Sequence, residues 1–70
     1  MNEVLKSMVG KASPEQIRKI RQAVQECDRY IAIEGPRAAD LRPAKIAVQL
    51  AFYIQHRADL MEVLASQVGA

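Results

Sequence analysis

Residues 44–55, AKIAVQLAFYIQ, are apolar on nearly every side when they are wound as an α-helix. The whole chain has only 70 residues, of which 26% are charged, so it must be asked what covers this segment. A domain of this length buries a small fraction of its surface, and its core rarely contributes more than about 3–5 kcal/mol. The fold is therefore decided by what covers residues 44–55.

Small domains are commonly stabilised by disulfides, a metal ion or a second copy of the chain. An intrachain disulfide is excluded because Cys27 is the single cysteine. A structural zinc site normally needs four ligands, and Cys27 and His56 are the only soft ligands here. We therefore expect no metal and no cofactor, and oligomerisation remains as the route to stability. An unpaired thiol also favours a cytoplasmic protein.

Membrane insertion is not expected, because no segment approaches the roughly 18–20 apolar residues of a transmembrane helix. Glu3 and Lys6 interrupt the apolar N-terminus, so we do not expect a signal peptide. The formal net charge is +2. This mild positive charge falls short of the dense basic surface that drives nucleic-acid binding by itself.

Glycine and proline divide the chain into three helical stretches, and no stretch shows the two-residue alternation of a strand. In the first stretch, Asn2 is placed to cap the helix and Gly10 to close it in a left-handed conformation. The predicted helices span about residues 3–9, 14–34 and 43–66.

The second helix has a well-marked start, because Ser13 and Gln16 form a capping box around Pro14. We expect it to end near Glu34, where glycine and proline follow. Its apolar residues recur at steps of 3, 4, 3 and 4, as in a heptad repeat. This predicted core face consists of Ile17, Ile20, Val24, Cys27 and Ile31.

The third helix carries an apolar stripe that covers about half of its circumference, wider than the roughly 100° that one neighbouring helix requires. Val48, Phe52 and Val63 form a second, smaller patch outside this stripe. The stripe itself consists of Ile46, Leu50, Tyr53, Ile54, Leu60, Met61 and Leu64, with alanines beside it.

The connection predicted at residues 35–42 is short enough to fold the two long helices back antiparallel. Counting from this turn pairs Cys27 with Leu50 and Ile20 with Arg57. One hairpin leaves half of the stripe uncovered, and a second copy would bury it in a four-helix bundle. We therefore expect a single all-α domain over residues 1–70: an antiparallel helical hairpin with a short N-terminal helix, dimerising into a four-helix bundle.

No residue pattern points to catalysis. Cys27 lies within the apolar face of its helix, where a cysteine behaves as a small buried hydrophobe. His56 lies on the polar flank of the third helix, and the acidic residues form no close pair for general acid–base chemistry. The chain has no glycine-rich phosphate loop and no HExxH motif. We therefore expect a non-enzyme with no catalytic residue and no small-molecule substrate.

Arg57 interrupts the apolar stripe of the third helix. A bare charge buried there would cost several kcal/mol, so its stem either runs along the stripe to the edge or its charge is paired. The functional alternative is a polar contact that sets the register of a dimer or binds a partner's carboxylate. Asp28, at the edge of the second helix's apolar face, is the candidate partner within the chain.

A surface for a larger protein is predicted on the smaller patch, with Phe52, Val48 and Val63 as contacts and Arg57 for polar specificity. Arg37 and Arg42, near the turn, are predicted to provide charge complementarity. The alternative is that the first helix covers this patch, because its own apolar residues also need a partner surface. Those residues are Val4, Leu5, Met8 and Val9.

The predicted function is protein binding by a small cytoplasmic regulator: a homodimeric inhibitor or adaptor that occludes a larger protein, such as a transcription factor or a motor component. The alternative is DNA or RNA binding through basic clusters at the helix ends, which steep salt dependence would reveal. A third class is a structural subunit that is molten without its companion. The basic clusters are Arg29, Arg37, Arg42 and Lys45, and Lys11, Arg18, Lys19 and Arg21.

Overall fold

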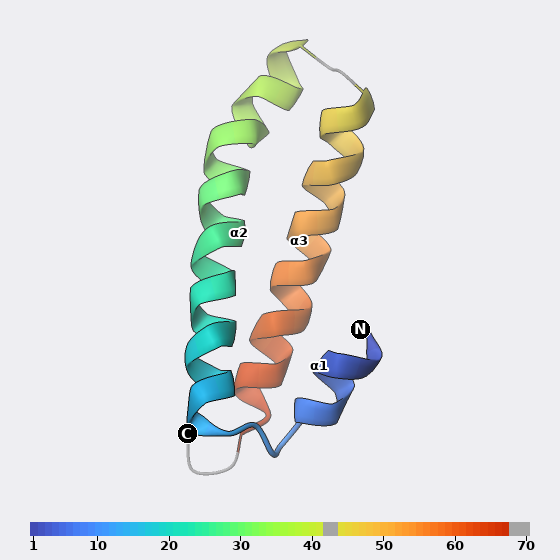
Figure 1. Cartoon of the computed structure of the whole chain (residues 1–70). Helices are drawn as coiled ribbons and strands as arrows, with labels where there is room; N and C mark the ends of the chain where they lie inside the picture. Colours follow the sequence, from blue (N-terminus) through green and yellow to red (C-terminus); the bar gives the residue numbers. More distant parts are fainter. Residues whose placement is uncertain (42–43, 68–70) are drawn as a thin grey trace.

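The computed structural model describes residues 1–41 and 44–67, with the backbone alone at 38–41 and 44. Three α-helices make up this part of the chain: α1 (Glu3–Met8), α2 (Pro14–Leu41) and α3 (Ala44–Ala65). Helices α2 and α3 lie side by side and run in opposite directions, and α1 lies against the C-terminal half of α3 (Figure 1). The prediction of an all-α protein is confirmed.

Helix α1 begins and ends where its local sequence signals place it. The Asn2 side chain accepts a hydrogen bond from the backbone N–H of Leu5 at 2.9 Å, which caps the first turn. Gly10, just after the helix, has a φ of 73°, in the left-handed region that glycine adopts without a steric penalty. One turn apart, Leu5 and Met8 are both buried. A helix this short is unstable alone, so packing of these side chains holds it in place.

The segment that follows α1 is attached to the end of α3 by hydrogen bonds. The backbone N–H of Gly10 donates to Ser66 Oγ at 2.9 Å. The N–H of Ala12 donates to Gln67 Oε1 at 2.9 Å, while Gln67 Nε2 donates to the Met8 carbonyl, also at 2.9 Å. Gln67 thus satisfies polar groups on both sides of the turn between α1 and α2, which fixes α1 relative to α3.

Helix α2 begins with the predicted capping box. The N–H of Gln16 donates to Ser13 Oγ at 3.1 Å, and the N–H of Ser13 donates to Gln16 Oε1 at 2.8 Å. These two reciprocal bonds satisfy backbone donors that the first turn of a helix leaves free. The start of α2 is therefore determined by four consecutive residues, as predicted.

The predicted end of α2 near Glu34 is wrong, because the helix continues through Pro36 to Leu41. The Arg37 guanidinium contacts Glu34 Oε1 at 3.3 Å across this segment, a spacing of three residues that a helical turn brings together. Glu34 and Gly35 are half-buried, so the helix still gains contacts where the local signals favour a break. Helix α2 thus continues across two residues that are intrinsically unfavourable in a helix interior.

The longer α2 shifts its register against α3. Arg57 contacts Asp28 instead of facing Ile20, and the rings of Tyr30 and Tyr53 stack with their centroids 4.1 Å apart. The predicted pairing was counted from a turn at residues 35–42. Moving the connection toward residues 42–43 displaces each contact by more than one helical turn.

The core lies at the open end of the α2–α3 pair, where α1 packs. Of the predicted core residues of α2 and α3 that do not belong to this buried core, Ile54 and Met61 are exposed and the rest are half-buried. The half-buried ones are Ile17, Ile31, Ile46, Leu50, Tyr53 and Leu64. The buried cluster consists of Leu5, Met8, Ile20, Val24, Cys27, Leu60 and Val63.

Candidate interaction surface on helix α3

Val48 and Phe52 present large apolar side chains to solvent, with exposed fractions of 70% and 62%. They are one helical turn apart, and His56 follows one turn later on the same side of α3. The Phe52 ring stacks on the His56 ring at 5.6 Å with an interplanar angle of 16°. It also meets the Tyr53 ring edge-on at 5.6 Å. We call Val48, Phe52 and His56 the Phe52 surface; its aromatic ring is exposed yet held by two neighbouring rings.

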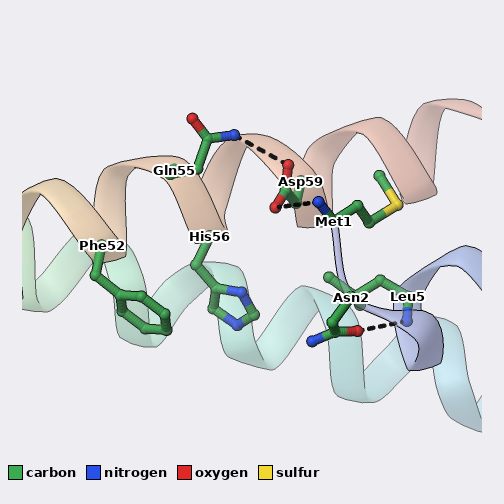
Figure 2. Close-up of a pocket in the computed structure, with 7 residues that line it drawn as sticks. All are labelled: Met1, Asn2, Leu5, Phe52, Gln55, His56 and Asp59. Carbon is green, nitrogen blue, oxygen red and sulfur yellow. Dashed lines mark hydrogen bonds and ion pairs between the residues drawn. The ribbon is translucent and has the colours of Figure 1, made fainter.

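A groove between the start of α1 and α3 adjoins the Phe52 surface (Figure 2). Phe52 and His56 lie at one end of this groove, and Asp59 lies at the other. Gln55 Nε2 donates to Asp59 Oδ1 at 3.1 Å, and the α-amino group of Met1 lies 3.7 Å from Asp59 Oδ2. The groove therefore combines an apolar wall with a polar end, as binding sites for protein side chains commonly do. Its lining residues are Met1, Asn2, Leu5, Phe52, Gln55, His56 and Asp59.

The prediction that Val63 shares an exposed patch with Val48 and Phe52 is wrong, because its side chain is 0% exposed. Val63 belongs to the core cluster together with Leu5 and Met8 of α1. Helix α1 thus covers the C-terminal end of the predicted patch and leaves its N-terminal end exposed. Both alternatives drawn from the sequence hold, each for a different part of the patch.

Arg57 is paired with Asp28, the candidate partner within the chain, through a hydrogen bond from its Nε to Asp28 Oδ1. The Arg57 side chain remains 40% exposed. Its charge therefore reaches the surface at the boundary between α2 and α3 and is not buried in the core. An ion pair exposed to this extent contributes about 0–1 kcal/mol to stability.

We therefore expect an Arg57→Leu variant to fold. Leucine favours helices and extends the apolar surface of α3, while the lost ion pair costs at most about 1 kcal/mol. Circular dichroism should show unchanged helicity and an unfolding midpoint equal to or above that of the wild type, and sedimentation should show altered self-association. Asp28→Asn is the control, because it removes the charge pair without adding apolar surface. Loss of helicity in Arg57→Leu would show that the ion pair is required to hold α2 against α3.

A second interhelical contact, between Tyr30 and Tyr53, did not emerge from the sequence because it depends on the true register. The Tyr30 hydroxyl donates to Gln49 Oε1 at 3.0 Å. The pKa of Tyr30 is raised, mainly by desolvation and further by the nearby Glu34 carboxylate and Tyr53. The hydroxyl therefore stays protonated, as a donor in this bond must be. By contrast, the stack of Phe52 on His56 was foreseeable, since the two residues are four apart on one helix.

Several basic side chains of the predicted clusters have acidic neighbours. Lys19 Nζ lies 3.6 Å from Glu15, and Arg37 Nη1 lies 3.3 Å from Glu34. The Arg37 side chain is nonetheless more than half exposed, so it remains accessible to a partner. Arg42, the other arginine predicted near the turn, lies outside the described residues.

Cys27 is in the core, and its environment opposes nucleophilic chemistry. Desolvation is the main cause that raises the pKa of its thiol, and the carboxylates of Asp28 and Glu26 add to this effect. A raised pKa keeps the thiol protonated near neutral pH, whereas the thiolate is the reactive form. Among residues 1–41 and 44–67, no group of three or more histidine, cysteine, aspartate or glutamate side chains is placed to hold a metal ion.

No protein-family model, curated protein or solved structure matches the chain. In the part of the chain that the structure describes, no helix has the length and apolar character needed to cross a membrane. A helical fold by itself is compatible with many functions. The function is therefore inferred from the surfaces of α3.

Proposed function

We propose that this chain is a small non-enzymatic protein-interaction module: a homodimeric regulator, inhibitor or adaptor that binds and occludes a larger protein, such as a transcription factor or a motor component. The observation that carries the proposal is the exposure of Val48 and Phe52, at 70% and 62%. Large apolar side chains grouped on a surface mark sites of interaction. A chain with so small a core would gain by covering them.

Phe52 suits the centre of such a contact. Aromatic residues contribute much of the binding energy at protein interfaces when they enter a pocket on the partner. The rings of His56 and Tyr53 restrict the Phe52 ring, so little side-chain entropy is lost on binding. The groove beside it adds a carboxylate, Asp59, that can accept a hydrogen bond from the partner. Arg37 and Arg42 add charge complementarity toward the α2–α3 connection.

Self-association is the second part of the proposal: two helical hairpins form a four-helix bundle. It is supported by Ile54 and Met61, which lie on α3 with exposed fractions of 52% and 42%. These residues belong to the wide apolar stripe that one neighbouring helix does not cover. Pairing of two copies would remove them from water.

We expect a Phe52→Asp variant to lose its partner. A charge at the centre of an apolar contact must be desolvated without a counter-charge, which should weaken binding by at least tenfold. Tagged wild-type and variant chains are compared in parallel by pull-down from native lysate. The captured protein is then purified, and its affinity for both chains is measured by calorimetry.

Gln22→Asp is the matched control, because Gln22 is exposed on α2 and lies two residues, about 200°, from buried Val24. This control should bind as the wild type does. Equal capture by wild type, Phe52→Asp and the control would contradict the proposed surface. Helicity measured by circular dichroism shows that each chain is folded.

The salt dependence of the affinity distinguishes nucleic-acid binding, the alternative function, from protein binding. Phosphate contacts release counterions, so affinity falls steeply as salt rises, whereas an apolar contact responds little. The pairing of Lys19, Arg37 and Arg57 with carboxylates lowers the positive potential available for phosphates. Nucleic-acid binding would be favoured if the partner binds at low salt but not at moderate salt, and if the Phe52→Asp variant still binds it.

A further inference from the structure

An apolar strip runs along the solvent-exposed side of α3 without a charged residue in it. Its residues follow one another at steps of 4, 3, 4, 3 and 4, which is the heptad spacing of a helix that packs against another helix. All of them are exposed, and the two largest are Ile54 and Met61. We call this set the alanine-rich strip: Ala47, Ala51, Ile54, Ala58, Met61 and Ala65.

The alanine-rich strip and the Phe52 surface lie on different sides of α3. Side chains two positions apart on a helix point in directions about 200° apart. Met61 therefore points away from Val63, which α1 covers. For the same reason Ile54 points away from Phe52. The strip is thus open along its length while α1 occupies the other side of the helix, and a second helix can reach it without displacing α1.

We propose that a second copy of this chain covers the alanine-rich strip, with the two α3 helices antiparallel about a two-fold axis at the level of His56. Ile54 then contacts the partner's Ala58, and Met61 contacts the partner's Ala51. The inference rests on the proposed self-association and deepens it by naming the helix that mediates it and the register of the pair.

The order of large and small residues along the strip favours this register. In the antiparallel arrangement each large side chain meets an alanine, so the four central layers have similar width, and the outermost layers pair Ala47 with the partner's Ala65. A parallel, in-register pair would place Ile54 on Ile54 and Met61 on Met61, with alanine on alanine between them. Those alternating wide and narrow layers leave gaps that forfeit packing energy.

The residues that flank the strip on its α2 side are compatible with burial in the same dimer. Leu50, Arg57 and Leu64 lie there, each half-buried already. The antiparallel register brings Leu50 near the partner's Leu64, which extends the apolar contact. Arg57 lies near the two-fold axis and is already paired with Asp28, so association would not bury an unpaired charge.

The surface area of the chain also fits the loss of one face to a partner. Its accessible surface is 5119 Å². A compact monomer with a mass of 7.8 kDa is expected to expose about 4,400 Å². The chain therefore exposes about 700 Å² more than a compact monomer of its mass, and association with a second copy would bury part of this surface.

Disulfide trapping tests the register. Ile54→Cys and Ala58→Cys chains are prepared separately, mixed and oxidised with a copper catalyst. We expect a cross-linked dimer that contains one chain of each kind, because residues 54 and 58 lie at the same level on opposite helices. Each variant alone should give little product, since two copies of residue 54 are separated by about 6 Å along the axis. The wild type, with buried Cys27 alone, sets the background.

The outcomes of this experiment separate the two levels of the proposal. Cross-linking of each variant with itself would indicate parallel helices and overturn the register. A dimer in sedimentation without a cross-link from the mixture would overturn the α3 contact but leave self-association in place. A wild type that sediments as a monomer at high concentration would overturn both, whereas the partner test with Phe52→Asp would still stand.

A charge placed on the strip provides a second measurement. Ala58→Glu should weaken self-association by at least tenfold, because the glutamate faces apolar Ile54 of the partner with no counter-charge. Gln22→Glu adds the same charge on the far side of α2 and should sediment as the wild type does. Both chains should keep their helicity, since both positions are exposed. Unchanged dimerisation of Ala58→Glu would overturn the proposal.

Discussion

A Leu60→Ala variant is expected to be largely unfolded at 25 °C. Leu60 is 3% exposed and lies in the core cluster between α1, α2 and α3. Truncating a buried leucine to alanine costs about 2–5 kcal/mol, while the core of a chain this small contributes only about 3–5 kcal/mol. Urea unfolding followed by circular dichroism, at several protein concentrations, measures the loss.

Glu62→Ala is the control for Leu60→Ala. Glu62 lies two residues farther along α3, is exposed, and its replacement exchanges one strong helix former for another. Its unfolding midpoint should stay close to that of the wild type. If Leu60→Ala also kept the wild-type midpoint, the core would not be located at the open end of the α2–α3 pair.

Replacing Gly35 and Pro36 with alanine is expected to stabilise the protein. Both residues lie inside α2, where proline is about 3 kcal/mol and glycine about 1 kcal/mol less favourable than alanine. A Cβ atom added at Gly35 meets no atom within 4 Å, so alanine fits there. The double variant should gain up to about 4 kcal/mol in the free energy of unfolding, measured by urea denaturation.

Gly10→Ala is expected to lower the stability measured in the same assay. Gly10 has a φ of 73°, so alanine at this position adopts a left-handed conformation that costs about 1–2 kcal/mol. The double replacement of Gly35 and Pro36 should therefore raise the unfolding midpoint, and Gly10→Ala should lower it. A midpoint that falls in the Gly35→Ala, Pro36→Ala variant would show that α2 ends before Gly35 in solution.

The helix starts could be predicted because they depend on adjacent residues. Asn2 and the pair Ser13 and Gln16 satisfy backbone donors within one turn, and the structure shows those bonds. The end of α2 could not be predicted in this way. Gly35 and Pro36 carry a strong local signal to stop, yet the helix continues through them to Leu41. The error in the end of α2 then displaced the predicted register, which was counted from that point.

The candidate surfaces could be predicted in part. Helical spacing placed Val48 and Phe52 outside the main stripe, and both are exposed. The same spacing grouped Val63 with them, since it does not reveal where a six-residue helix such as α1 will dock. It likewise could not tell that Ile54 and Met61 lie outside the core, because a stripe wider than one neighbour leaves open which edge is covered.

The position of the core has a consequence for how the chain folds. The connection between α2 and α3 brings residues together that are near in sequence, but the buried cluster forms at the other end of the pair. Contacts there close long loops, as the hydrogen bond from Gln67 to Met8 across 59 residues shows. Early pairing of α2 and α3 next to their connection therefore gains little free energy. During synthesis, a nascent chain would remain unstable until the end of α3 had left the ribosome, after which the three helices would fold together.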